Sequence, residues 1–349
     1  MKPHALHSQV AVLNQPGQPL ELVDIHVPEL RAGEVLVKVT TSTICGSDLH
    51  TFTGRRKGPL PTILGHEIIG IIAGVHADQS SSSTSKVRVG DRVTWSIAAS
   101  CGSCERCCRE LPQKCDSLFK YGHENFNAFP LSGGLSEYCV LQPGTRIVTI
   151  PAEIPDAVAC PASCATATVA AAFRTAGDVS QRRVLITGAG MLGLTACAFA
   201  SANAAADVVV CDLDESRLQL ATKFGATQLI RSVDTHDFDF VFEMSGSSGA
   251  VAVGIQAAAI GGVVVLVGSV SPSKSVELDP EQIVRRLITI HGVHNYKPDD
   301  LVTAVDFLQQ HHQNFPFADL VEATFPLHEA QAALEHAEAQ RPIRVAVRP

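Results

Sequence analysis

The chain has 349 residues, of which 46% are hydrophobic, and its 27 basic and 35 acidic residues give a formal net charge of -8. Neutralising phosphates requires a net basic face, so this charge argues against nucleic acid as a partner. The longest apolar stretch, Ala257 to Val270, is rich in glycine and shorter than the ~20 residues that cross a bilayer. No apolar run follows Met1. We therefore expect a cytoplasmic, globular protein of two domains with no membrane partner.

The first part of the chain has the pattern of β structure. From Leu20 to Val93, short apolar runs such as 35–39 and 68–72 alternate with glycine, proline and polar turns. This texture is typical of an antiparallel, barrel-like β domain. The serine-rich run from Ser80 to Ser85 has no apolar periodicity, and we interpret it as a solvated loop insertion.

Four of the eleven cysteines stand together in a polar stretch at about 98–118. Cys101, Cys104, Cys107 and Cys115 are separated by two, two and seven residues. This spacing allows four thiolates to converge on one tetrahedral ion, so it predicts a closed structural zinc site. Because the chain shows no secretory signal, we interpret the cysteines outside metal sites as small buried hydrophobes rather than disulfide partners.

The pattern of apolar residues changes at about Asp156. Alanine-rich segments of helical length separate short apolar runs that have the character of buried strands, at 184–186, 208–210, 240–242 and 263–267. This rhythm predicts an α/β domain with a doubly wound parallel sheet. We expect the first domain at 1–155 and the second at 156–295. We expect residues 296–349 to return to the first domain, through an amphipathic stretch at 299–310 and a strand at 343–347.

A glycine turn joins the first of these strands to a helix. Gly188, Gly190 and Gly193 follow the Gly-x-Gly-x-x-Gly pattern between a strand and a helix, which is the context that a dinucleotide site requires. Gly188 allows the tight turn, Gly190 lets a pyrophosphate approach the backbone, and Gly193 lets helix and strand pack closely. The N–H groups around Met191 and Leu192 are expected to hold the phosphates. The alternative is a glycine turn that binds nothing.

Charged residues at the end of the next strand affect whether the site prefers NAD or NADP. Asp212 can accept both ribose hydroxyls of an adenosine, and the acidic Asp214 and Glu215 repel a 2′-phosphate. These residues predict NAD rather than NADP. Arg217 argues in the opposite direction, because an arginine here accommodates a 2′-phosphate.

Two further motifs contain metal-ligand residue types: CGSDLH at 45–50 and GHEIIG at 65–70. With the four-cysteine stretch and the glycine turn in the same order, they resemble the zinc-dependent alcohol dehydrogenases of the medium-chain dehydrogenase/reductase superfamily over nearly the whole chain. The resemblance implies an N-terminal GroES-like β-barrel catalytic domain, a Rossmann domain, and two zinc ions per chain, one catalytic and one structural. It also implies a homodimer or homotetramer.

The resemblance implies a catalytic zinc on Cys45, His66 and one further cysteine near the domain junction, which is either Cys160 or Cys164. In the alcohol dehydrogenase branch this ligand stands four residues before a threonine that lies beside the nicotinamide. Cys164 and Thr168 have this form, so Cys164 is preferred. In this family zinc lowers the pKa of the alcohol hydroxyl while a hydride passes to the nicotinamide.

Other roles follow from the same resemblance. Ser47 and His50 form a proton relay with the cofactor ribose, although the alternative is that both simply line a loop. Asp48 orients the histidine ligand from outside the coordination shell. Glu67 is either an outer carboxylate or a transient fourth ligand. Arg344 contacts the cofactor pyrophosphate, and the alternative for this residue is an exposed basic side chain.

The substrate is less closely defined. Three segments resemble a branch of the superfamily associated with phosphonate catabolism: KYGHE at 120–124, GGLSEY at 133–138 and HNYKP at 294–298. Arg55, Arg56 and Lys57 are compatible with an anionic phosphonate or carboxylate tail, and the alternative is a solvated basic loop.

Three polar residues of these segments are candidates for the substrate cleft. The resemblance places His294 and Asn295 near the nicotinamide, where either can touch substrate. His123 can also face the cleft, but we expect it to be a structural histidine with its hydrogen bonds satisfied.

The first hypothesis is therefore a zinc- and NAD-dependent dehydrogenase for a small polar, phosphonate-type or otherwise anionic alcohol, interconverting alcohol and aldehyde. A polyol or amino-alcohol substrate is an alternative within the same superfamily. Two further hypotheses are a zinc-independent enone or quinone reductase and a non-catalytic binding protein that retains the fold.

Overall fold

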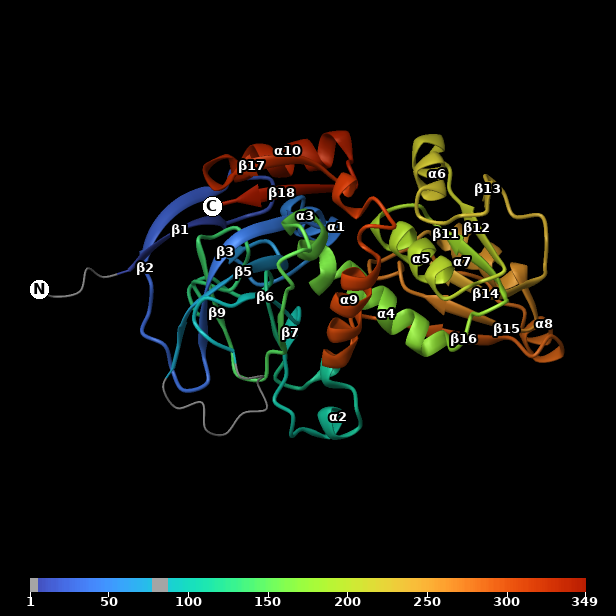
Figure 1. Ribbon diagram of the computed structural model, residues 1–349, viewed down its shortest axis with the longest axis horizontal. Coiled ribbons are helices and arrows are strands. Elements are labelled where there is room, and N and C mark those ends of the chain that lie inside the picture. The colour runs from blue at the N-terminus through green and yellow to red at the C-terminus, as the bar shows by residue number, and fades with distance from the viewer. Residues whose placement is uncertain (1–5, 77–86) are drawn as a thin grey trace, which may run out of the picture. The chain divides into compact units, whose positions relative to one another are not determined.

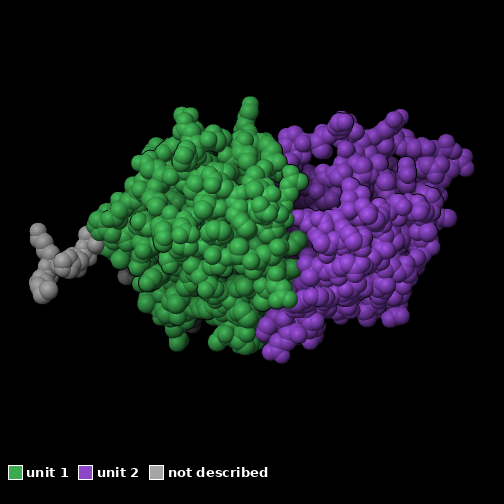
Figure 2. Space-filling view, turned by 90° about the horizontal axis from the view of Figure 1, so that it is seen from above, with its two compact units in different colours: residues 1–164, 297–309, 317–349 green, residues 165–296, 310–316 purple. Residues whose placement is uncertain are grey.

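The structure is a computed structural model that describes residues 6–76 and 87–349; the serine-rich run from Ser80 to Ser85 lies outside these ranges. The chain forms two compact units (Figure 2). The first contains residues 1–164, 297–309 and 317–349, and the second contains residues 165–296 and 310–316. The boundary thus falls at Cys164 rather than at residue 155. The short return of 310–316 to the second unit is absent from the sequence prediction.

The first unit is built from β-sheets. Its seven-stranded sheet has the order β10-β6-β5-β3-β18-β17, with β9 also paired to β3, and two smaller sheets have the orders β2-β1-β4 and β7-β8. The strands are β1 His7–Leu13, β2 Glu21–His26, β3 Val35–Ile44, β4 Thr62–Ile63, β5 Glu67–Val75, β6 Arg92–Trp95, β7 Ala98–Ala99, β8 Phe119–Lys120, β9 Tyr138–Leu141, β10 Ile147–Thr149, β17 Val321–Pro326 and β18 Arg344–Arg348.

Short helices connect these strands. They are α1 Gly46–Phe52, α2 Glu105–Cys108, α3 Asp156–Ala159, α9 Pro298–His311, α10 Ala330–Gln340 and the 3-10 turns η1 Pro112–Lys114, η2 Cys160–Ser163, η3 Phe317–Leu320 and η4 Leu327–Glu329. The loop that carries α2 projects from the body of this unit (Figure 1). The last two residues of α9 belong to the second unit.

Strand pairing brings distant segments of the first unit to the end of β3. β5 pairs antiparallel with β3, with Thr43 opposite Glu67, and β18 pairs antiparallel with the other edge of β3, with Val345 opposite Ile44. The chain after β3 turns at once into α1. Residues from three separate segments, 35–52, 67–75 and 344–348, therefore meet where β3 ends, and this is where the candidate metal ligands lie.

The second unit confirms the predicted parallel sheet. Its six strands have the order β13-β12-β11-β14-β15-β16, and every pairing is parallel. The elements are α4 Ala165–Ala176, β11 Arg183–Thr187, α5 Met191–Ala202, β12 Asp207–Cys211, α6 Glu215–Thr222, β13 Gln228–Ile230, β14 Phe238–Glu243, α7 Ser248–Ala257, β15 Ala258–Leu266, α8 Pro280–Arg285 and β16 Thr289–Gly292. Figure 1 shows the helices packed along these strands.

Local sequence explains where several of these helices begin. Asp214 caps α6 by accepting hydrogen bonds from the N–H groups of Ser216 and Arg217. Asp279 caps α8, and Pro280 occupies its first turn, where a missing N–H is harmless. Within the described residues, no single helix is long and apolar enough to cross a membrane; the bent pair formed by 156–163 and 165–176 passes that test by length and composition only.

Candidate active site and metal centres

The first candidate metal site lies at the end of β3, the start of β5 and the end of η2. Ligand atoms of Cys45, His66, Glu67 and Cys164 all lie within 4.8 Å of one another. Cys45 follows β3 and precedes α1, His66 directly precedes β5, and Cys164 follows η2. All four belong to the first unit. Two thiols and one imidazole are ligand types that zinc prefers, so the donor set fits this metal.

Cys160, the alternative third ligand, has different contacts. Its buried thiol lies 3.1 Å from the carbonyl oxygen of Glu67 and 3.4 Å from that of Thr41. Burial raises the pKa of this thiol, which keeps it protonated. Among the described residues, the group of potential ligands around His66 includes Cys164 and not Cys160. The geometry therefore favours Cys164.

The protonation states of these groups couple metal binding to proton release. A hydrogen bond from Cys164 and the nearby charge of Arg344 lower the pKa of the Cys45 thiol well below its usual value, although burial opposes them. Burial alone lowers the pKa of His66, but the carboxylate of Asp48 outweighs it and the pKa is raised to about 10. Zinc ligation requires the neutral imidazole and thiolates, so metal binding displaces protons here.

Two side chains of α1 bracket His66. Oδ1 of Asp48 lies 3.0 Å from Nδ1 of His66 and also accepts the N–H of Gly65 at 3.0 Å, while Oδ2 accepts the N–H of Cys45 at 2.9 Å. Asp48 thus holds both candidate ligand loops, as the sequence predicts for its orienting role. The hydroxyl of Ser47 lies 3.2 Å from Nε2 of His66, the nitrogen left for a metal.

Glu67 forms a buried ion pair with Arg344. The guanidinium nitrogens Nε and Nη2 each lie 2.8 Å from a carboxylate oxygen, and Nη2 lies 3.7 Å from Sγ of Cys45. The alternative that Arg344 is an exposed basic residue is wrong, because only 8% of the residue is exposed. The pyrophosphate contact stays a prediction. Neither motif that surrounds these two residues gives a signal for their pairing.

The four-cysteine stretch forms a second candidate metal site. Ligand atoms of Cys101, Cys104, Cys107 and Cys115 lie within 4.8 Å of one another, and the closest pair, Cys101 and Cys115, is separated by 3.5 Å. Backbone N–H groups of Ser103 and Cys104 lower the pKa of Cys101 to about 5. Four converging sulfurs without an open position fit a closed tetrahedral zinc site.

The three consecutive cations after α1 have different surroundings. Nη2 of Arg55 lies 2.9 Å from both carboxylate oxygens of Glu338, and this pair is exposed. Arg56 donates its backbone N–H to the carbonyl of His50 at 2.8 Å. Arg55 thus already has a carboxylate partner at the surface, and the binding of a substrate anion by these cations stays a prediction.

The glycine turn lies at the carboxyl end of β11. Gly188 has a φ of +95°, and a Cβ on Gly193 would lie 1.7 Å from the carbonyl oxygen of Gly188, so a side chain fits at neither position. Gly190 caps α5, which begins at Met191 and continues through the half-buried Leu192. This places free N–H groups of a helix start at the turn.

Asp212 lies directly beside the glycine turn. Its Oδ2 accepts the N–H of Ala189 at 2.6 Å, and its Oδ1 accepts the N–H of Asp214 at 2.8 Å. Nη1 of Arg217 lies 4.0 Å from the position that a Cβ on Gly190 would occupy. Asp212 and Arg217, which argue in opposite directions in the choice between NAD and NADP, therefore both lie at the turn. Thr168 is half-buried in α4, and Asn295, after β16, has a buried Nδ2 without a hydrogen-bond partner, whereas the neighbouring His294 is exposed.

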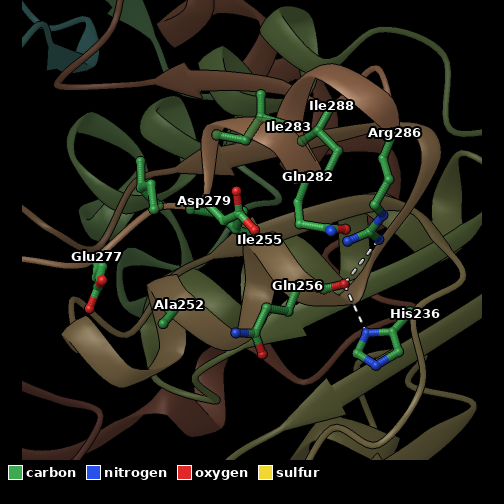
Figure 3. A pocket seen from close by; sticks show the side chains of 11 residues that line it. His236, Ala252, Ile255, Gln256, Glu277, Asp279, Gln282, Ile283, Arg286 and Ile288 are labelled. Carbon is green, nitrogen blue, oxygen red and sulfur yellow. Dashed lines mark hydrogen bonds between the residues drawn. The ribbon is translucent and has the colours of Figure 1, made fainter.

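A large cavity in the second unit lies away from this turn. Its volume is about 490 Å³, and it is lined by residues of α7, α8 and the segments before β14 and β16 (Figure 3). His236 and Arg286 both bond to the carbonyl oxygen of Gln256 at its wall. The cavity thus lies at the amino ends of the strands, whereas dinucleotides bind at the carboxyl ends. We do not assign the cofactor to it.

Comparison with known proteins agrees with this arrangement. Residues 31–152 match the alcohol dehydrogenase GroES-like domain, and residues 192–310 match the zinc-binding dehydrogenase domain. The L-threonine 3-dehydrogenase of Deinococcus radiodurans is 31% identical over 300 residues, which cover 80% of this chain and 81% of the relative. That of Pyrococcus horikoshii is 31% identical over 304 residues, which cover 81% and 82%.

Solved structures give the same result. An alcohol dehydrogenase from Thermotoga maritima is 27% identical, with a TM-score of 0.90 and coverage of 99% of this chain and 100% of the other. A protein from Escherichia coli CFT073, described as a short chain alcohol dehydrogenase complexed with NADH, is 26% identical, with a TM-score of 0.84 and coverage of 98% and 99%. The chain belongs to the zinc-binding alcohol dehydrogenase family of the medium-chain dehydrogenase/reductase superfamily.

Proposed function

We propose that this oxidoreductase transfers a hydride between a small polar alcohol and NAD, and that its catalytic zinc is held by Cys45, His66 and Cys164. The observation that carries the proposal is the convergence of these three ligand atoms within 4.8 Å, in a chain that belongs to the zinc-binding family. Glu67 lies in the same group, but its two oxygens are bound by Arg344. The fourth position is therefore left for substrate, as a catalytic zinc site requires.

Zinc bound here supplies a Lewis acid that lowers the pKa of the alcohol hydroxyl, and a bound nicotinamide supplies the hydride acceptor. The chain itself provides the route for the proton. Ser47 stands 3.2 Å from the ring nitrogen of His66, and His50 follows one turn later in α1. We assign the relay to these two side chains. Burial, followed by the charge of Arg55, lowers the pKa of His50 and keeps it neutral and able to accept a proton at pH 7.

NAD is the proposed cofactor because of the carboxylate of Asp212. This carboxylate accepts two backbone N–H groups at the glycine turn. The ribose of a dinucleotide lies at this turn in Rossmann domains. Arg217 reaches the same turn, so the preference for NAD over NADP needs its own measurement. Gly188, Gly190 and Gly193 would receive the pyrophosphate, and Thr168 would lie beside the nicotinamide. The assembly proposed for the enzyme is a homodimer or homotetramer.

Zinc content and NADH formation, measured on the same sample, test this function. We expect two zinc ions per chain and NADH formation with at least one member of a panel of simple, polyol, amino, carboxylate-bearing and phosphonate-bearing alcohols. Cys45→Ala is expected to lose one zinc and all turnover while it stays folded and binds NADH. Turnover that survives removal of this zinc would instead support the zinc-independent reductase.

The matched comparison is Cys104→Ser in the four-cysteine stretch. A closed zinc site contributes folding free energy directly. We therefore expect this variant to lower the stability of the fold more than the turnover of the protein that remains folded. If both variants lose folding to the same extent, the two sites have been assigned wrongly. Two zinc ions together with bound NADH, but without turnover of any alcohol, would indicate a binding protein that retains the fold.

A second candidate substrate is L-threonine. Two relatives that are 31% identical to this chain are L-threonine 3-dehydrogenases. L-Threonine is a secondary alcohol with a carboxylate, so it is compatible with the proposed chemistry. Its ammonium group separates it from the carboxylate-bearing and phosphonate-bearing alcohols of the panel, and comparing these substrates directly decides between them.

A further inference from the structure

Two buried polar residues outside the catalytic metal ligands differ in how their hydrogen bonds are satisfied. Within the described ranges, the buried Nε2 of His123 has no hydrogen-bond partner, so the expectation that this histidine is structural and satisfied is wrong. Glu243, the last residue of β14, is completely buried, and both oxygens of its carboxylate accept hydrogen bonds. Acidic side chains are rarely buried completely unless they are compensated in this way. The partners of Glu243 therefore show what it holds in place.

The carboxylate of Glu243 binds two loops. Its Oε1 accepts the N–H groups of Ser245 and Gly246 and the hydroxyl of Ser245, each at 2.7 Å. Its Oε2 accepts the hydroxyl of Ser269, which follows β15, at 3.2 Å. Thr187 lies opposite Glu243 in the register of β11 and β14, but its buried Oγ1 has no hydrogen-bond partner among the described residues. The carboxylate therefore holds the two loops rather than the side chain of the neighbouring strand.

Ser245 connects this carboxylate to the glycine turn. A Cβ on Gly188 would lie 2.9 Å from Cα of Ser245, so a side chain does not fit between the turn and the loop after β14. A Cβ on Gly246 would lie 2.5 Å from the carbonyl oxygen of Gly268, so the loops after β14 and β15 are equally close. The loops after β11, β14 and β15 are therefore packed directly against one another, and Glu243 holds the central one.

The sheet places these loops where a dinucleotide binds. In the order β13-β12-β11-β14-β15-β16, the chain runs outward from β11 through β12 to β13 and then returns to β14 on the other side of β11. Sheets of this type bind dinucleotides outside the carboxyl ends of the strands at this reversal, with one mononucleotide half on each side. Asp212, after β12, lies on the side expected for the adenosine. Ser245 and Ser269, after β14 and β15, lie on the side expected for the nicotinamide half.

The glycine turn has separate anchors on the adenosine side. The N–H of Gly188 donates to the carbonyl of Cys211, the last residue of β12, at 2.8 Å. The N–H of Ala189 donates to Oδ2 of Asp212, the next residue, at 2.6 Å. Neither bond involves Glu243. Removing its carboxylate therefore leaves the adenosine side of the turn attached and releases only the loops on the nicotinamide side.

We propose that Glu243 is a positioning residue for the nicotinamide half of the cofactor and that it acts by fixing the loops after β14 and β15. This inference rests on the proposed function, because it requires a nicotinamide dinucleotide at the glycine turn. Since Glu243 is completely buried, it acts through other groups, namely the backbone of Ser245 and Gly246 and the hydroxyl of Ser269. The adenosine half does not depend on it.

The binding of NADH and of AMP separates this role from a general one. NADH occupies both halves of the site, whereas AMP contains only the adenosine half, and each is titrated calorimetrically into the zinc-loaded protein. Glu243→Ala removes all four hydrogen bonds to the carboxylate. We expect the Kd of NADH to rise by about 10- to 100-fold in this variant and the Kd of AMP to stay unchanged. Glu243→Gln keeps an acceptor oxygen and should restore most of the NADH affinity, whereas Asp212→Ala should weaken both ligands.

Phe238→Leu is the matched control for a loss of stability. Phe238 is buried at the opposite end of β14, so a smaller side chain there destabilises the same sheet and leaves the two loops in place. Thermal unfolding followed by circular dichroism measures the stability of each variant, and we expect Phe238→Leu to bind both ligands as the wild type does. If Glu243→Ala does not fold, Ser269→Ala decides, because it removes only the bond to Oε2. It should weaken NADH by about 3- to 10-fold and leave AMP unchanged.

Three results overturn the proposal. They are an equal loss of NADH and AMP affinity in the deciding variant, unchanged NADH affinity in that variant, and a loss of NADH affinity in Phe238→Leu as large as that in Glu243→Ala. A wild-type protein that does not bind NADH contradicts the cofactor of the proposed function, and this inference then fails with it. Failure of the inference alone leaves NADH binding by the wild type intact, so the two failures are distinguishable.

Discussion

Arg344 and Glu67 lie 277 residues apart in the chain and form a buried two-point ion pair, with Nε and Nη2 each 2.8 Å from a carboxylate oxygen. The pair stands at the end of β3, where β5 and β18 flank that strand on opposite sides. It joins the C-terminal strand of the first unit to a residue that neighbours the ligand His66. The carboxylate of Glu67 is thereby compensated without a metal.

Arg344→Met is expected to lower the free energy of unfolding of the first unit by about 3–5 kcal/mol, because it leaves a buried carboxylate without a partner. Trp95 is the chain's one tryptophan and is buried in the first unit, so its fluorescence during urea denaturation reports on this unit. Adding Glu67→Gln should recover part of the loss. Arg55→Gln, which breaks an exposed pair with Glu338, should change the midpoint little, since such pairs contribute about 0–1 kcal/mol. Equal effects of Arg344→Met and Arg55→Gln would contradict the role of burial.

Asp48→Asn tests how the catalytic zinc ligands are held. Asp48 accepts three bonds, from the two backbone N–H groups of Gly65 and Cys45 and from Nδ1 of His66. An amide replaces one acceptor oxygen with a donor, so at least one of these bonds is lost. Removing such an outer partner weakens metal binding by about 10- to 100-fold. We expect one of the two zinc ions to be removed by a weaker chelator than in the wild type, and the four-cysteine zinc to stay. Loss of both ions together would contradict a local role.

Local patterns in the sequence predicted most of what lies close together in the chain. The spacing of Cys101, Cys104, Cys107 and Cys115 and the glycine turn at Gly188 each specify their own geometry within a few residues, so both could be identified directly. The parallel sheet followed from runs of buried residues and confirmed the predicted fold class.

Long-range pairing and the directions of neighbouring side chains could not be read in the same way. The partner of Glu67 depends on which strands flank β3, and nothing near Arg344 in the sequence encodes that choice. Arg55 and Arg56 are identical residue types next to one another, yet Arg55 forms an ion pair with Glu338, and no ion pair of Arg56 is found within residues 6–76 and 87–349. The sequence around them does not distinguish the two.

Asp212→Ala tests the cofactor preference. The variant removes a carboxylate that binds the N–H groups of Ala189 and Asp214 and that is expected to receive the ribose hydroxyls. We expect kcat/KM for NAD to fall by about 10- to 100-fold, with a smaller loss for NADP, because the residue also repels a 2′-phosphate. Initial rates with the two cofactors at one alcohol concentration measure the ratio. In Arg217→Gln the ratio should move toward NAD, and an unchanged ratio in both variants would contradict the assignment.

The pH dependence of alcohol oxidation tests His50 as the proton acceptor. Its pKa is lowered from 6.5, first by burial and next by the charge of Arg55. Only the neutral imidazole accepts a proton, so kcat should fall as the pH decreases through this pKa, below 6.5. Arg55→Gln removes the positive charge and leaves Glu338, which raises the pKa, so the acid limb should move to higher pH. His50→Gln should lower kcat and abolish the limb, whereas Lys38→Met, a change at an exposed residue of β3, should leave it in place. Steady-state kcat measured from about pH 5 to pH 8 resolves these shifts. If the acid limb persists unchanged in His50→Gln, a group other than His50 is responsible for it. That result would contradict the assignment of His50 as the proton acceptor.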